Sequence, residues 1–153
     1  MNDEISIDEK LGEMLDDLYL LYPLFHKNIL IPKNFEGNRK IALTYYLTLI
    51  LLKDSGNLSI SEIGNHMGMK KQNMTYLTNK LVEEGLVQRL HDLSDRRVIK
   101  IAITPKGNEY LDEWRSSKIK ETKRSLPFDD DEDLKTLQSS IENIRRVFLK
   151  IDN

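Results

Sequence analysis

The fold is most constrained by residues 58–107, which read LSISEIGNHMGMKKQNMTYLTNKLVEEGLVQRLHDLSDRRVIKIAITPKG. Ser59 and Glu62 have the spacing of a capping box, and Gly68 interrupts the helical pattern that begins there. Three apolar residues then recur at helical spacing: Met74, Leu77 and Leu81. Two short helices joined by a glycine-containing turn predict a helix-turn-helix. A plain pair of packed helices fits the same spacing and is the alternative.

The second of these helices is predicted to present a polar face. If its apolar stripe faces the core, the other side chains lie toward solvent or to the sides. These are Lys71, Gln72, Thr75, Tyr76, Asn79 and Lys80, with Lys70 at the helix start and Asn73 beside Gln72. Gln and Asn match the N6 and N7 edge of adenine, and Lys matches guanine or phosphate. The pattern predicts a helix that reads a DNA major groove, and the alternative is an ordinary solvated face.

Two short strands are predicted after this helix, at residues 86–90 and 98–104, because β-branched residues alternate in the second. Residues 91–97 would form the tip of the hairpin. The tip carries one acid and two arginines, Asp95, Arg96 and Arg97. Such arginines can enter a minor groove, and Asp95 is expected to hold a neighbouring arginine by a charge-assisted hydrogen bond. The alternative is a surface salt bridge of little energetic value.

A long helix is predicted near the start of the chain and a second one before the helix-turn-helix. Ser6 and Glu9 form a capping-box pattern, and Pro23 is expected to kink or split the helix that follows. Its apolar stripe is Leu11, Leu15, Leu18, Tyr22, Phe25 and Ile29. Residues 40–54 are apolar on most faces, which predicts a buried helix capped by Gly56.

Two further helices are predicted after this hairpin, which is called a wing when it follows a helix-turn-helix. Thr104 and Pro105 suit the start of a helix through about Arg124, after which Pro127 interrupts the chain. The acidic run 129–133 suits the N-terminus of a last helix better than it suits a cation site. The apolar stripe of that helix is Leu134, Leu137, Ile141, Ile144, Phe148 and Ile151. The stripes at the two ends of the chain predict burial across a dimer interface, with packing inside one chain as the alternative.

Composition excludes several classes of function. The chain has 153 residues, 39% of them hydrophobic, and a net charge of −2, which fits one soluble globular domain. Residues 59–104 nevertheless carry seven Lys or Arg against five Asp or Glu, a local excess that suits phosphate. The absence of cysteine excludes disulfides, thiolate zinc sites and thiol oxidation. We found no metal-ligand, cofactor or catalytic motif, no signal peptide and no segment long enough to span a bilayer, so a cytoplasmic non-enzyme without cofactor or metal is expected.

Residues 58–107 resemble the DNA-binding lobe of the MarR family of bacterial transcriptional regulators. The resemblance is carried by the helix-turn-helix, by Glu-Gly-Leu-Val at 84–87, by Asp-Arg-Arg at 95–97 and by Ile-Thr-Pro-Lys-Gly at 103–107. The chain departs from the family at Lys70, where members often place a small hydroxyl residue.

This resemblance implies a mainly α fold with a small β wing, in one domain spanning 1–153. It implies a winged helix-turn-helix lobe at about 40–107 and dimerisation helices at 5–30 and 105–151. The implied function is a homodimeric repressor of a pseudo-palindromic operator, with recognition helices in major grooves, wings in minor grooves, and release by a small aromatic or anionic effector. The expected DNA-binding residues are Lys70, Lys71, Gln72, Asn73, Thr75, Tyr76, Lys80, Arg89, Asp95, Arg96 and Arg97.

Two alternatives remain open at this stage. A winged-helix module that binds protein, without specific DNA binding, would show an apolar patch in place of the charges. Five aromatic residues could line an effector pocket or belong to the core, and core residues are the commoner case. They are Tyr19, Tyr22, Tyr45, Tyr46 and Trp114.

Overall fold

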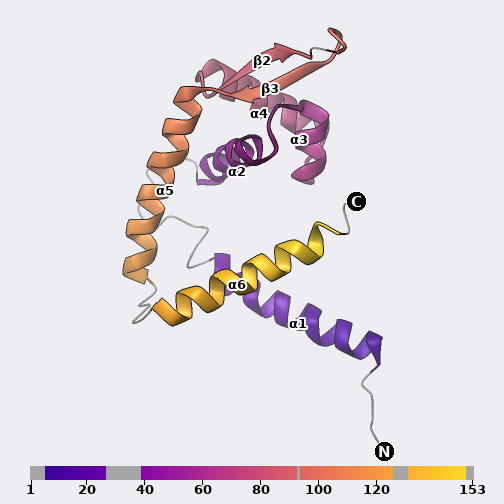
Figure 1. The fold of residues 1–153 in the computed structure, drawn as a ribbon, viewed down its shortest axis with the longest axis vertical. Coiled ribbons are helices and arrows are strands. Elements are labelled where there is room, and N and C mark those ends of the chain that lie inside the picture. Colours follow the sequence, from indigo (N-terminus) through magenta and orange to yellow (C-terminus); the bar gives the residue numbers. More distant parts are fainter. Residues whose placement is uncertain (1–5, 27–38, 93, 126–130, 151–153) are drawn as a thin grey trace, which may run out of the picture.

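The protein is mainly α-helical with one small antiparallel sheet, as predicted. The computed structural model describes residues 6–26, 39–92, 94–125 and 131–150. Its elements are α1 (Ile7–Phe25), α2 (Arg39–Ser55), β1 (Leu58–Ser59), α3 (Ile60–His66), α4 (Lys71–Glu83), β2 (Val87–His91), β3 (Ile99–Ile103), α5 (Pro105–Ser125) and α6 (Asp131–Phe148). We call α2 through β3 the winged lobe. Figure 1 shows α5 leading away from this lobe toward α6 and α1, with the β2–β3 hairpin projecting at the opposite end.

The sheet has the strand order β1-β3-β2, and both pairings are antiparallel. In the hairpin Val87 lies opposite Ile103, and His91 lies opposite Ile99. The two strands that the sequence predicts are confirmed to within one residue at each end. Strand β1 was not predicted, because its two residues pair with β3 but are too short to give a periodic signal.

The core lies inside the winged lobe, between α2, the α3–α4 pair and one face of the sheet. Its members are Tyr45, Leu49, Leu52, Ile63, Met74, Leu77, Leu81, Leu86, Val87, Ile101 and Leu111. One side of α2 belongs to this core, but Leu47 and Ile50 on its other side are 43% and 42% exposed. The prediction of a buried α2 is therefore confirmed for one side of the helix and wrong for the other, because the lobe covers only one of its faces.

Local signals in the sequence set the helix boundaries. Both predicted capping boxes form, with Ser6 and Glu9 at α1 and with Ser59 and Glu62 at α3. Gly56 and Gly68, which the sequence predicts at helix ends, adopt positive φ angles, and so does Gly85, which follows α4. At Gly68 the φ of 61° lets the chain leave α3 and approach α4 within a few residues, a conformation that strongly favours glycine.

Helix α1 runs through Pro23 and ends two residues later at Phe25. The proline thus lies in the last turn of the helix. Of the predicted kink or split, the split is wrong, because the helix is continuous through Pro23. Ile29, which the sequence assigns to the same apolar stripe, lies outside the described residues.

The helices after the wing begin where the sequence predicts. The Thr104 hydroxyl accepts a hydrogen bond from the Gly107 backbone N–H at 3.1 Å, which caps the first turn of α5. Helix α6 opens with Asp131, Glu132 and Asp133 in its first turn, where carboxylates favour the helix dipole. Residues 129 and 130, Pro127 and Ile151 lie outside the described part of the chain.

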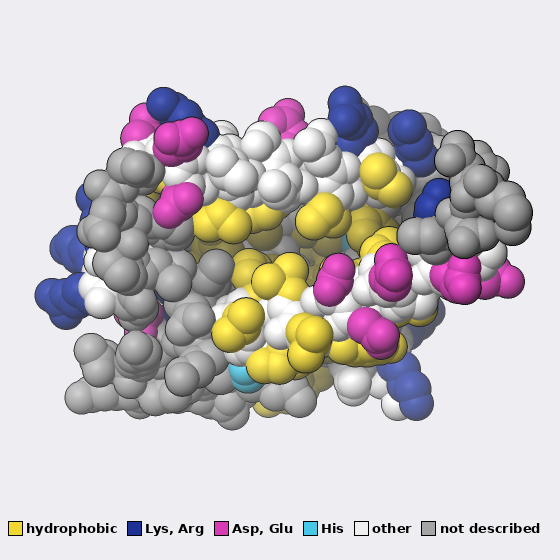
Figure 2. Space-filling model, turned by 90° about the horizontal axis from the view of Figure 1, so that it is seen from below, with side chains coloured by type: hydrophobic (Ala, Val, Ile, Leu, Met, Phe, Trp, Pro, Cys, Tyr) yellow, Lys and Arg dark blue, Asp and Glu magenta, His cyan; other side chains and the backbone are white. Residues whose placement is uncertain are grey.

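The apolar stripes of α1 and α6 are exposed in the single chain. Neither helix has a buried residue, and side chains such as Leu18, Ile141 and Phe148 are between 37% and 56% exposed. Figure 2 shows hydrophobic side chains gathered between these helices on the face remote from the wing. A groove of about 600 Å³ lies there, with Leu21 of α1 and Val147 of α6 among its lining residues.

The aromatic residues divide between core and surface. Tyr45 is buried, and its hydroxyl donates a hydrogen bond to Glu84 at 3.1 Å. Tyr46 of α2 stacks on Trp114 of α5 with ring centroids 5.6 Å apart, which joins the lobe to the helix that leaves it. Tyr19 and Tyr22 are exposed on α1. Within the described ranges, no helix has the length and apolarity to cross a membrane.

Glu62 links the start of α3 to the sheet. Its carboxylate accepts hydrogen bonds from the Ser59 backbone N–H at 2.6 Å and from the Lys100 ammonium on β3 at 2.9 Å. The bond from Lys100 contributes most, and together these contacts lower the pKa of Glu62 from 4.5 to about 2. The ionised form of Glu62 therefore favours the folded state.

We predict that Gly107→Ala destabilises the protein by about 1–3 kcal/mol, although alanine is the better helix former. A Cβ at residue 107 would lie 2.2 Å from the backbone oxygen of Leu86, so the start of β2 would have to move. Chemical denaturation measures the effect. Gly12→Ala is the matched control, because a Cβ there meets nothing within 4 Å, and it should be neutral or stabilising. Equal stability of the two variants would contradict the close packing at Gly107.

We predict that Glu62→Gln lowers the thermal stability near neutral pH, while glutamine can still cap α3. The contribution of ionised Glu62 is complete above its usual pKa of 4.5 and is lost as the pH falls through about 2. The carboxylate is 46% exposed, so solvent screening should limit the loss to about 1 kcal/mol. Thermal unfolding of both proteins across this acidic range should show the difference shrinking. A difference independent of pH would rule out the ion pair as its cause.

Candidate nucleic-acid interface

One face of α4 is anchored in the core. Met74 and Leu81 are fully buried and Leu77 is 7% exposed, which confirms the predicted apolar stripe. Thr78 is buried as well, at 1% exposure. The sequence did not indicate this fourth position, because threonine is read as polar although its methyl group can pack in a core. The burial fixes the rotation of α4 about its axis, and with it the residues that face outward.

The opposite face of α4 is polar and accessible. Its exposed members are Lys70, Lys71, Gln72, Asn73, Thr75, Tyr76 and Asn79, and Lys80 is partly exposed. Lys70 occupies the N-cap position without a side-chain cap, consistent with its departure from the small hydroxyl residue often found there. The positive end of the helix dipole and two ammonium groups therefore coincide at the start of α4, an arrangement that favours an anion such as phosphate.

Two predicted site residues on α4 have partners inside the helix. The Thr75 hydroxyl donates to the Lys71 carbonyl oxygen at 2.9 Å. The Lys80 ammonium lies 2.7 Å from the Glu83 carboxylate, and this contact raises the pKa of Lys80. Its charge is therefore partly compensated, whereas Lys70 and Lys71 form no ion pair with the residues that the structure describes.

The turn at the wing tip is organised by Asp92. Its Oδ1 accepts hydrogen bonds from the Ser94 hydroxyl, from the Ser94 backbone N–H at 2.8 Å and from the Asp95 backbone N–H at 3.2 Å. The bond from the Ser94 hydroxyl contributes most to lowering the pKa of Asp92. This pattern is an Asx turn, in which an aspartate side chain replaces a backbone acceptor. Asp92 was not among the predicted site residues, although an Asp two residues before a Ser is a recognisable turn signal.

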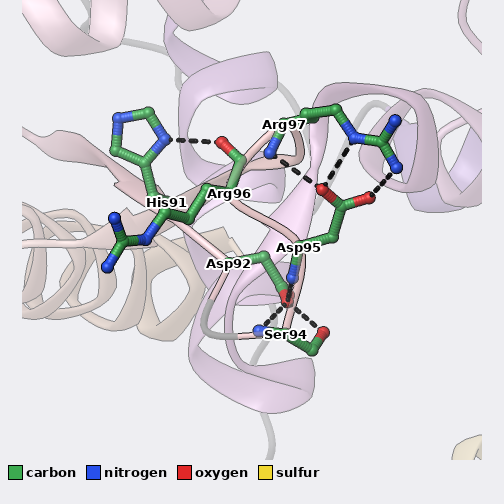
Figure 3. Close-up of polar contacts among 6 residues, drawn as sticks. All are labelled: His91, Asp92, Ser94, Asp95, Arg96 and Arg97. Carbon is green, nitrogen blue, oxygen red and sulfur yellow. Dashed lines mark hydrogen bonds and ion pairs between the residues drawn. The ribbon is translucent and has the colours of Figure 1, made fainter.

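The two wing arginines have different surroundings (Figure 3). The Asp95 carboxylate accepts hydrogen bonds from Arg97 Nε and from a terminal guanidinium nitrogen, both at 3.1 Å, and from the Arg97 backbone N–H at 3.0 Å. The predicted role of Asp95 as the holder of a neighbouring arginine is thereby confirmed for Arg97. The pair lowers the pKa of Asp95 and raises the pKa of Arg97. The Arg97 side chain remains 91% exposed, so it is oriented without being covered.

Arg96 lies on the other side of the wing. Figure 3 shows its guanidinium pointing away from that of Arg97, on the side of His91. The Arg96 carbonyl oxygen lies 3.0 Å from His91 Nδ1, which closes the base of the tip. The structure therefore brings Asp95 and Arg97 together and keeps Arg96 apart. The sequence placed His91 at the start of the predicted hairpin tip but gave no indication of this contact.

Arg89 links the wing to α4. A terminal guanidinium nitrogen of Arg89, on β2, donates a hydrogen bond to the Asn79 side-chain oxygen at 2.5 Å. The sequence placed Asn79 on the polar face of its helix, but no local pattern indicates a partner ten residues away. The contact joins Arg89, a predicted DNA-binding residue, to Asn79, which was predicted only to lie on the polar face of α4.

The combined surface of α4 and the wing is polar. Of its large hydrophobic side chains, Tyr76, Leu90 and Ile99 are exposed, at 64%, 38% and 44%. They are scattered over a helix and two strands, which does not fit the continuous apolar patch expected of a protein-docking face. In the described residues no group of three or more His, Asp or Glu side chains is arranged to hold a metal ion. This surface can bind anions through its lysines and arginines, and its amide groups can form hydrogen bonds with base edges.

Comparisons with known proteins agree with this geometry. A family model described as "MarR family" matches residues 41–99. The HTH-type transcriptional repressor MdtR of Bacillus subtilis is 30% identical over 125 residues, which cover 80% of this chain and 79% of MdtR. This match extends well beyond the winged lobe.

Solved structures share the fold. A MarR family protein from Bacillus stearothermophilus aligns with a TM-score of 0.67 at 19% identity, covering 95% of this chain and 99% of that protein. Bordetella bronchiseptica BpsR, whose DNA binding is regulated by 6-hydroxynicotinic acid, aligns with a TM-score of 0.53 at 18% identity over 92% of this chain and 96% of its own. The chain therefore belongs to the MarR family of transcriptional regulators, whose DNA-binding element is a winged helix-turn-helix.

Proposed function

We propose that the protein is a homodimeric repressor that binds a pseudo-palindromic operator in double-stranded DNA. The observation that carries this proposal is the pairing of an outward-facing polar helix, anchored by its buried face, with a wing whose arginine is already oriented. Two such lobes in a dimer would place their recognition helices about 10 base pairs, or a multiple of that distance, apart.

The wing suits a minor groove because Arg97 is held before any DNA arrives. Its guanidinium donates two hydrogen bonds to the Asp95 carboxylate while the side chain stays 91% exposed, so little side-chain freedom would be lost on binding. Asp95 itself repels phosphate, but its side chain is the less exposed of the pair, at 41% against 91% for Arg97. Arg96 offers a second cation on the other side of the tip. The narrow negative minor groove favours insertion of such groups.

Helix α4 suits a major groove because its exposed face begins with phosphate-binding groups and continues with amides. Lys70 and Lys71 lie at the positive end of the helix, and Gln72 and Asn73 follow in its first turn. Residues at the start of a recognition helix contact base edges, and the amides match adenine. Thr75, Tyr76 and Lys80 extend the same contact surface, and Arg89 flanks it from the wing.

Dimerisation is proposed because the apolar faces of α1 and α6 stay exposed to solvent in the single chain. Exposed residues on these helices include Leu11, Leu15 and Leu18 on one and Leu137, Ile141 and Ile144 on the other. Burial of these apolar faces against a second copy of the chain would remove them from water and stabilise the dimer.

Repression and effector control are inferred from relatives. MdtR is a transcriptional repressor, and BpsR has DNA binding regulated by 6-hydroxynicotinic acid, a small aromatic acid. An effector of that chemical class, aromatic or anionic, is therefore proposed here without assignment of pocket residues. The site of action would be the cytoplasm, where the operator DNA lies.

We predict that substitutions in the two parts of the interface have different effects on binding to DNA from upstream of the protein's own gene. Arg96→Ala and Arg97→Ala should weaken binding to all sequences and make the salt dependence shallower, by about 1 in logarithmic slope for each lost phosphate contact. Gln72→Ala and Asn73→Ala should instead reduce discrimination at single base pairs by about 1–3 kcal/mol for each lost bidentate contact. Gel-shift titrations with operator and mismatched duplexes separate these effects.

Wild-type affinity in both arginine variants would overturn the wing model. The wild-type protein could instead bind all duplexes equally and weakly, with no dependence on salt. That result would favour a winged-helix module that binds protein.

We predict that Ile141→Glu converts the dimer to a monomer, because it places a charge within the apolar face of α6. Light scattering after size-exclusion chromatography should change from twice the chain mass of 17.9 kDa to that mass. Ser139→Glu is the control, since residue 139 lies about 200° around the helix from residue 141 and carries the same added charge. Dissociation by Ser139→Glu alone, or a stable Ile141→Glu dimer, would place the interface elsewhere.

A further inference from the structure

The contact between Arg89 and Asn79 lies where the recognition helix meets the wing. Arg89 belongs to β2 and Asn79 to α4, and the guanidinium donates to the amide oxygen at 2.5 Å. Both residues are exposed. An exposed hydrogen bond of this kind adds little to folding stability, so its position in the interface raises the question of what else it does.

The strand register explains why Arg89 reaches α4. Side chains two residues apart on a strand share a face, so Arg89 lies on the same face as Val87, which is 2% exposed. Its cross-strand partner is Ile101, which is fully buried on that face. Arg89 is therefore on the side of the sheet that packs toward α4, one step beyond the point where the core ends.

The helix supplies the matching position. Gln72, Thr75 and Asn79 are spaced by three and four residues, so they form one stripe along the exposed side of α4. The bond to Asn79 thus draws the guanidinium of Arg89 to the far end of the stripe that begins with the proposed base-reading amides.

The chemistry of the partner distinguishes this contact from the one at the wing tip. Asp95 orients Arg97 and also offsets its charge, whereas the Asn79 amide is neutral and orients Arg89 without offsetting its charge. A phosphate that approaches Arg89 meets no carboxylate from this partner. A neutral acceptor therefore suits a cation that must be fixed in place and still bind an anion strongly.

We propose that Asn79 is a positioning residue that holds Arg89, without offsetting its charge, against a backbone phosphate at the junction of the recognition helix and the wing. This inference rests on the proposed DNA-binding function and adds to it a role for a residue that does not itself contact a base. The identity of residue 79 as amide rather than carboxylate is the testable feature.

The test uses the full-length protein and fluorescence anisotropy with duplex DNA from upstream of its gene, over a salt series of about 50 to 200 mM. Asn79→Asp keeps the oxygen that accepts from Arg89 but adds a negative charge. We expect weaker binding and a shallower logarithmic salt slope, by about 0.9 per subunit, because one phosphate contact is lost. Asn79→Ala leaves the charge of Arg89 but frees its side chain, so affinity should fall by roughly two- to tenfold with the slope unchanged.

Gln88→Glu is the matched control. It adds the same charge to β2 on the neighbouring residue, whose side chain points to the other face of the strand and is exposed. This variant should keep the wild-type slope, and all three variants should keep the wild-type melting temperature within a few degrees.

Three results would overturn the inference. The first is wild-type affinity and salt slope in Asn79→Asp. The second is the same affinity and salt slope in Asn79→Asp and Gln88→Glu. The third is a loss of affinity in Asn79→Ala that is explained by a large loss of thermal stability. Failure of the wild-type protein to bind any duplex is a different result, because it removes the proposed function itself and the inference with it.

Discussion

The burial of one face of α4 is the constraint on which the rest of the interface depends. Met74, Leu77 and Leu81 pack into a core that also holds Leu49 of α2 and Val87 of β2. This packing fixes the rotation of the helix, so that its amides and lysines face outward. It also brings the wing strand against the same helix. A change that loosened this core would disturb the helix and the wing together.

The core positions α4 and the wing, and polar contacts then orient the side chains at their surface. Asp92 builds the turn at the wing tip, Asp95 orients Arg97, and Asn79 receives Arg89. These contacts are exposed and contribute little to stability. The contacts to Arg97 and Arg89 order their side chains in advance, so each arginine would lose less conformational entropy on binding a phosphate. The stability of the lobe therefore comes from its apolar core, whereas the orientation of its exposed cations comes from surface hydrogen bonds. The ordering of exposed cations is relevant to function more than to folding.

Much of this fold could be predicted from the sequence because its signals are local. The capping boxes of Ser6 and Ser59, the turn at Gly68 and the stripe on α4 each depend on residues within a few positions of one another. Contacts between distant elements were missed, including the pairing of β1 with β3 and the bond between Asn79 and Arg89. The exposed side of α2 was also missed, because apolar composition does not tell which faces a neighbour covers. The DNA-binding roles of the predicted residues remain predictions, since they depend on a partner molecule.

The most direct measurement is the equilibrium binding of the purified wild-type protein to labelled DNA from upstream of its own gene, by fluorescence anisotropy across a salt series, with an unrelated duplex for comparison. We predict tight binding to the upstream DNA, much weaker binding to the unrelated duplex, and affinity that falls steeply as salt increases. Equal and weak binding to both duplexes, insensitive to salt, would contradict it.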